Sequence, residues 1–143
     1  MASGFLVLSD GRCFAKSWSF HDRAIQCVAE QLATSSLGAW LLEQLPGPTD
    51  EELGYGAWYR VKDGAHVERF IDLREFTPES QAQFTDAVLR AAEVADASDR
   101  ALMSELADMV ARQRRGEPPL SRSDWREVVP SRGRKIGPDW SAD

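Results

Sequence analysis

The chain has 143 residues, of which 43% are hydrophobic and 28% are charged, and its formal net charge at pH 7 is −6. This length suffices for one domain with its own core, and the composition is too apolar for a chain that stays unfolded. No apolar run approaches the roughly 20 residues of a membrane-spanning helix, and the run 5–8 is too short for the core of an export signal. We therefore expect a soluble cytoplasmic protein, with no membrane partner, whose cysteines Cys13 and Cys27 are free thiols.

Residues 5–16 predict a β-hairpin, because Asp10 and Gly11 stand between two apolar runs and this dipeptide favours a tight two-residue turn. With that loop, Leu8 would face Cys13 and Leu6 would face Ala15, and all four would belong to the core. The opposite face would be partly exposed and would carry Val7, Ser9, Arg12, Phe14 and Lys16.

Two helices are expected to follow this hairpin. Ser19 is a typical N-cap, with Asp22 in the first turn, so the first helix should begin at about Phe20. Its apolar stripe comprises Phe20, Ala24, Cys27, Val28 and Leu32. A second short amphipathic helix presents Leu37, Trp40, Leu41 and Leu45, and the sequence Pro-Gly-Pro at 46–48 ends it.

The second half of the chain repeats this order of elements. Residues 57–73 predict a second hairpin around Asp63-Gly64. Thr77 followed by Pro78 predicts the start of a third helix, with Phe84, Val88 and Ala91 or Ala92 on one face. The last helix is expected to begin at Ser98, to present Leu102, Leu106, Met109 and Val110, and to end before Gly116.

The predicted fold class is therefore α+β. We expect a four-stranded antiparallel sheet built from two hairpins, in ββααββαα order, with the helices on one face. Residues 1–116 would form this domain. Residues 117–143 contain four of the seven prolines, and we expect an extended strap that packs on the domain through Trp125, Val128, Val129, Ile136 and Trp140.

Charge is unevenly distributed. Residues 1–111 carry nine Lys/Arg and 18 Asp/Glu, a net of −9, whereas residues 112–143 carry eight and five, a net of +3. Residues 79–108, in the last two predicted helices, carry seven Asp/Glu and two Arg, a net charge of −5, which fits either a solvated surface or a surface that docks a basic protein partner. The predicted protein-binding residues are Asp50, Glu51, Glu52, Tyr55, Trp58, Tyr59, Asp86, Glu93, Asp96 and Asp99. The aromatic ones follow the acidic loop 50–52, and such residues are common in binding hot spots.

The basic C-terminal tail offers an alternative function. Arg132, Arg134 and Lys135 could neutralise phosphates and Trp140 could stack on a base, which would make the protein a nucleic-acid-binding accessory factor. Arginines at 112, 114 and 115 have a simpler interpretation, since cations stabilise the C-terminal end of a helix.

Catalysis and metal binding have little support in the sequence. Cys13, His21, Cys27 and His66 are the only cysteines and histidines, and their spacing does not match the close pairs of a zinc site. Both histidines are expected to be exposed or lightly hydrogen-bonded, and both cysteines to be buried on faces that pack together. No nucleotide-binding or hydrolase motif occurs. We predict a protein without cofactor or catalytic residues that binds a macromolecule, such as an inhibitor, an immunity protein or a blocker of a defence complex.

Overall fold

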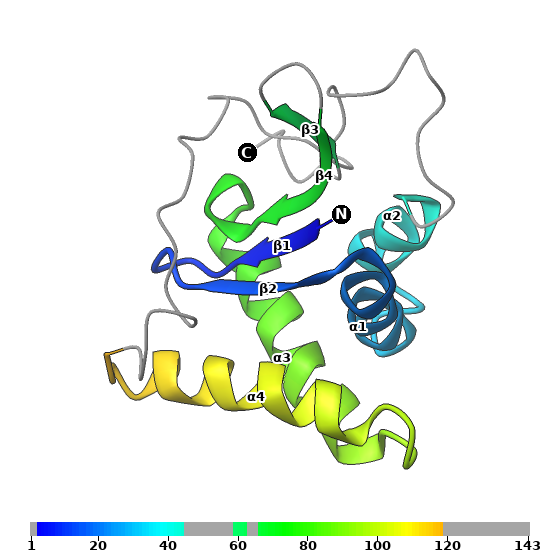
Figure 1. Ribbon diagram of the computed structural model, residues 1–143. Helices are drawn as coiled ribbons and strands as arrows, with labels where there is room; N and C mark the ends of the chain where they lie inside the picture. Colours follow the sequence, from blue (N-terminus) through cyan, green and yellow to red (C-terminus); the bar gives the residue numbers. More distant parts are fainter. Residues whose placement is uncertain (1–2, 45–58, 63–65, 119–143) are drawn as a thin grey trace.

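The computed structural model describes residues 3–44, 59–62 and 66–118 (Figure 1). Within these ranges the strands are β1 (Ser3–Val7), β2 (Cys13–Ser17), β3 (Tyr59–Lys62) and β4 (His66–Asp72). The α-helices are α1 (Trp18–Glu30), α2 (Ser36–Gln44), α3 (Pro78–Val94) and α4 (Arg100–Arg114), and the short 3₁₀ helix η2 (Leu73–Glu75) links β4 to α3.

The four strands form one mixed sheet in the order β2-β1-β4-β3. The pairs β1/β2 and β3/β4 are antiparallel, but the two inner strands β1 and β4 pair in parallel. The predicted antiparallel sheet is therefore wrong. Helices α1 and α2 connect β2 to β3, and this helical connection lets β3 start in the same direction as β2. Strand β4 then runs in the same direction as β1.

The first hairpin differs from the prediction by one residue in its register. Val7 pairs with Cys13 and Leu6 pairs with Phe14, whereas a two-residue loop would have paired Leu8 with Cys13. The loop has three residues, because the Gly11 amide donates to the Leu8 carbonyl at 2.9 Å and Gly11 has a φ of 93°. A turn that ends in a glycine with positive φ adds one residue to the hairpin loop.

This shift changes which side chains share a face of the sheet. Leu6, Leu8 and Phe14 belong to the main core, while Val7 and Cys13 form a second buried cluster with Phe5 and Ala15. The predicted core face of Leu6, Leu8, Cys13 and Ala15 is thus wrong. Phe14 and Arg12, which we expected to be partly exposed, are both buried.

The main core is formed by the sheet together with helices α1, α3 and α4, and α3 packs against both α1 and α4. The predicted stripe of α3 is confirmed, since Phe84, Val88 and Ala91 are buried. Three predicted core residues of α4 are also buried, namely Leu106, Met109 and Val110, and so are Leu37 and Leu41 of α2. Cys27 belongs to this core and Cys13 to the other cluster, so the predicted packing of their two faces is wrong.

Helix α1 starts two residues earlier than predicted, directly from β2, with Ser17 at the N-cap. Phe20 consequently lies on the outer side and is 59% exposed. His21 is fully buried instead of exposed, because its ring lies directly against β1. A Cβ atom at Gly4 would come within 2.4 Å of His21 Cβ, so this approach requires glycine at position 4.

Helix α3 begins as predicted, with Pro78 at the start and the Thr77 hydroxyl accepting a hydrogen bond from the Ser80 amide at 3.2 Å. Helix α4 begins at Arg100 rather than Ser98. It ends before Gly116, whose φ of 71° allows the Glu117 amide to donate to the Arg112 carbonyl at 3.0 Å. None of the helices in the described ranges is both long and apolar enough to cross a membrane.

Candidate functional site

A depression of about 160 Å³ lies between α1, the end of α3 and the connection from α3 to α4. Helix α1 contributes Arg23, Cys27 and Glu30, and the connection contributes Asp96 and Asp99. The remaining lining residues are Gln31, Ala91, Val94 and Ala95. Of the charged residues that line it, three are acidic and one is basic, so the depression has a net negative charge.

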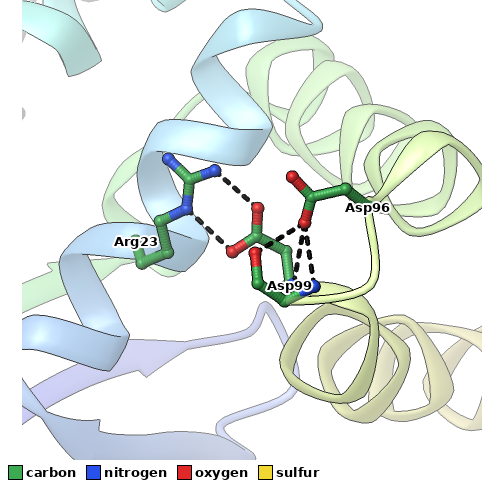
Figure 2. Close-up of polar contacts among 4 residues, drawn as sticks. Arg23, Asp96 and Asp99 are labelled. Atoms are coloured by element: carbon green, nitrogen blue, oxygen red, sulfur yellow. Dashed lines mark hydrogen bonds and ion pairs between the residues drawn. The ribbon is translucent and has the colours of Figure 1, made fainter.

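Two of the lining residues, Arg23 and Asp99, form an ion pair (Figure 2). Arg23 Nε donates to Asp99 Oδ1 at 2.8 Å, and Nη2 donates to Oδ2 at 2.5 Å. This two-point geometry is the strongest form of an arginine–carboxylate pair. The hydrogen bonds from Arg23 are the main reason that the pKa of Asp99 is lowered and that the pKa of Arg23 is raised. Both groups are therefore charged at neutral pH.

Asp96 organises the start of α4 (Figure 2). Its Oδ1 atom accepts hydrogen bonds from the Ser98 hydroxyl at 2.7 Å, the Ser98 amide at 3.0 Å and the Asp99 amide at 3.1 Å. The Ser98 hydroxyl, followed by the Asp99 amide, lowers the pKa of Asp96. The side chain is exposed, so its negative charge faces solvent at the rim of the depression.

Cys27 does not have the environment of a nucleophile. Burial raises the pKa of its thiol, and the nearby positive charge of Arg23 only partly opposes this. The thiol is thus protonated at neutral pH, whereas a reactive cysteine needs a stabilised thiolate. No histidine lines the depression within the described chain, and no group of three or more potential metal ligands occurs among the residues searched there.

The structure separates the acidic residues of the last two helices into two groups. One group is engaged in ion pairs: Asp86 with Arg114 at 2.6 Å, Asp99 with Arg23, Glu105 with Lys16 at 2.6 Å, and Asp108 with Arg112 at 2.8 Å. The other group consists of Glu79, Glu93 and Asp96, which are exposed and have no ion-pair partner in the described ranges.

Of the predicted binding residues, Glu93 and Asp96 lie together at the end of α3 and just beyond it, whereas Asp86 lies two turns earlier on this helix. Asp99 is only 7% exposed and belongs to the ion pair with Arg23, so it is not available to a partner at the surface. Tyr59 is the first residue of β3. The other predicted protein-binding residues, Asp50, Glu51, Glu52, Tyr55 and Trp58, lie outside the described residues.

The predicted nucleic-acid contacts Arg132, Arg134, Lys135 and Trp140 also lie outside the described residues, as does nearly all of the predicted strap. The arginines that are described at the end of α4 are engaged with carboxylates. Arg112 holds Asp108, Arg114 holds Asp86 and Arg115 holds Glu117. Their charges are therefore already compensated within the domain.

Sequence reasoning missed five residues that line the depression, among them Arg23, Glu30 and Val94. Arg23 and Asp99 are 76 positions apart in the chain, and no local pattern indicates that they meet. Val94 ends the apolar positions of α3, yet it is 67% exposed. Val94 and the acids around it become one surface only because the end of α3 lies next to α1, and no pattern in the sequence indicates this contact.

Comparison of the chain with protein-family models, with curated proteins and with solved structures found no match.

Proposed function

We propose that this protein is a non-catalytic binding protein that docks a basic protein partner through the surface around the depression. We define this acidic surface by Glu30, Glu93, Val94 and Asp96. The observation that carries the proposal is that its three carboxylates are exposed and have no ion-pair partner in the described chain, while four neighbouring acids on α3, α4 and their connection do.

Charge that is not compensated within the domain remains available to a partner. A negative surface accelerates the approach of a basic protein and adds specificity to the complex. Val94 supplies an exposed apolar contact beside the carboxylates, and the depression gives a long basic side chain a recess to enter. A mixture of a few apolar contacts and a polar rim is typical of protein interfaces.

The Arg23–Asp99 ion pair lies next to this acidic surface and connects two of the elements that form it. It joins α1, which carries Glu30, to the connection after α3, which carries Asp96. A rigid arrangement of charges loses less entropy when a partner binds. Inhibitors, immunity proteins and blockers of defence complexes work by such docking. The two buried free thiols fit a role in a reducing cytoplasm.

The test compares the wild type with the double variant Glu30→Gln/Glu93→Gln. Decalysine labelled with a fluorophore serves as the probe, and its anisotropy is measured with increasing protein at several salt concentrations. We expect weak binding by the wild type, which falls with salt, and at least a severalfold loss in the variant. The control Glu43→Gln/Glu79→Gln removes the same number of exposed charges from other parts of the molecule and should bind nearly as the wild type does.

The same three proteins are then used for affinity capture from cells of the source organism. A protein retained by the wild type and the control but lost with Glu30→Gln/Glu93→Gln would support the proposal. Equal retention by all three would contradict it. Tight duplex DNA binding that requires Arg132, Arg134 and Lys135 would instead favour the nucleic-acid function.

A further inference from the structure

A second, larger cavity of about 600 Å³ lies on another part of the domain. We call it the groove. Three segments form it: the β1–β2 turn with Ser9 and Asp10, the region from η2 into α3, and the C-terminal end of α4. Its lining residues are Ser9, Asp10, Leu73, Pro78, Gln81, Ala82, Thr85, Gln113, Arg114 and Gly116.

The groove carries little uncompensated charge. The exposed residues Pro78 and Ala82 give it an apolar part, beside which Leu73 is fully buried. Its two charged residues are both compensated: Asp10 by Arg12 at 2.9 Å and Arg114 by Asp86 at 2.6 Å. The other polar groups are neutral, and they form hydrogen bonds within the domain: the Gln113 amide donates to the Ser9 hydroxyl at 2.8 Å, and the Gln81 amide donates to the Leu73 carbonyl at 2.7 Å. An occupant should therefore carry apolar side chains and little net charge.

The chain leaves the described domain at the edge of this groove. Gly116 lines the groove and ends α4, and Arg12 then holds the next residue, because its Nη2 atom donates to the Glu117 carbonyl at 2.7 Å. Arg12 is only 3% exposed, so this anchor is fixed within the domain. The residues that follow Pro118 consequently start next to the groove.

The sequence that follows matches the groove in charge and polarity. Residues 119–129 contain two arginines and two acids, a net charge of zero, together with Leu120, Trp125, Val128 and Val129. The basic residues Arg132, Arg134 and Lys135 come only later. Seven residues beyond Pro118, at an extended rise of roughly 3.3 Å each, span about 23 Å, which is sufficient to carry Trp125 across the groove.

We propose that residues 119–129 of this chain bind in the groove and that Trp125 supplies the main apolar contact. A covalently linked segment that starts at the edge of its site is present there at a high effective concentration, so modest contacts are sufficient to hold it. This inference is independent of the proposed docking surface, which the groove does not share.

The test uses the full chain labelled with ¹⁵N, with backbone amide signals recorded by NMR. The variant Trp125→Ala should shift the amide signals of Ser9, Ala82 and Gln113, which line the groove. The control Trp140→Ala removes the same side chain from outside the segment and should leave these signals in place. Unchanged groove signals in Trp125→Ala, or shifts that Trp140→Ala produces equally, would overturn the proposal.

A reciprocal variant changes the groove instead of the segment. Ala82→Lys places a long charged side chain in the groove and should shift the indole N–H signal of Trp125, whereas Ala101→Lys, on an exposed position of α4, should not. An unmoved Trp125 signal in Ala82→Lys would count against the proposal. So would groove shifts that depend on protein concentration, because they would assign the groove to a second copy of the chain.

Discussion

At the residue scale, the contact between Gly4 and His21 shows how one small residue permits a buried polar one. Histidine is expected at partly exposed positions, and its helical position gave no reason to place it in the interior. It is buried because α1 begins directly after β2 and lies close against β1. The burial of His21 depends on the absence of a side chain at Gly4. Gly4 lies on another element, so no pattern within the helix indicates this contact.

We predict that Gly4→Ala destabilises the protein by about 1–3 kcal/mol, since the added methyl group overlaps His21 and one of the two elements must move. Urea unfolding followed by circular dichroism measures this loss. In the background of His21→Gly the same substitution should cost much less, because both the Cβ atom and the ring that overlap the added methyl group are gone. An equal cost in both backgrounds would rule out the steric explanation.

At the element scale, local sequence patterns predicted most of the helices and strands, but they did not predict how distant strands pair. The cap at Thr77 and the buried stripe of α3 follow from patterns within a few residues, and they are confirmed. The first hairpin was recognised from Asp10-Gly11, but its register depends on whether the loop contains two or three residues. The dipeptide alone permits both loop lengths. The parallel pairing of β1 with β4 leaves no local pattern, because any strand with an apolar face can accept either direction.

We predict that Thr77→Ala lowers the free energy of unfolding by about 1 kcal/mol, since the Ser80 amide then loses its capping acceptor. Thermal or urea unfolding measures the effect. The variant Thr77→Ser retains the hydroxyl and should stay within a few tenths of a kcal/mol of the wild type. A loss in Thr77→Ser as large as that in Thr77→Ala would assign the effect to the methyl group instead of the cap.

At the scale of the whole molecule, ion pairs connect elements that are distant in the sequence. Arg23–Asp99 links α1 to the start of α4, and Lys16–Glu105 links β2 to the middle of α4. The net charges read from the sequence suggested two oppositely charged regions, but these pairs neutralise part of the acidic region locally. The candidate site could be located only in part from the sequence. Glu93 and Asp96 were recognisable as acidic residues of the last two helices. Which of the neighbouring acids form ion pairs depends on tertiary contacts that the sequence does not indicate.

We predict that the Arg23–Asp99 pair makes stability depend on pH in the acid range. The folded state lowers the pKa of Asp99, so its contribution is present above the carboxylate's unfolded pKa of about 3.9 and is lost as the pH falls through the folded value. Unfolding measured between about pH 6 and pH 2 should therefore show a smaller loss for Asp99→Asn than for the wild type.

Arg23→Gln should reduce this acid-dependent loss in the same way, and the double variant should show little further change, because each substitution removes the same interaction. Additive effects of the two substitutions would show that Asp99 and Arg23 contribute separately.

The parallel pairing of β1 and β4 also constrains how the protein acquires its structure. Gly4 pairs with Arg69, so 65 positions of chain must be closed before the first strand gains its inner neighbour. Closing so long a segment is slow compared with forming a hairpin or a helix. During translation, the N-terminal hairpin therefore emerges from the ribosome well before β4 is made, and its inner edge stays open to other extended chains in that interval.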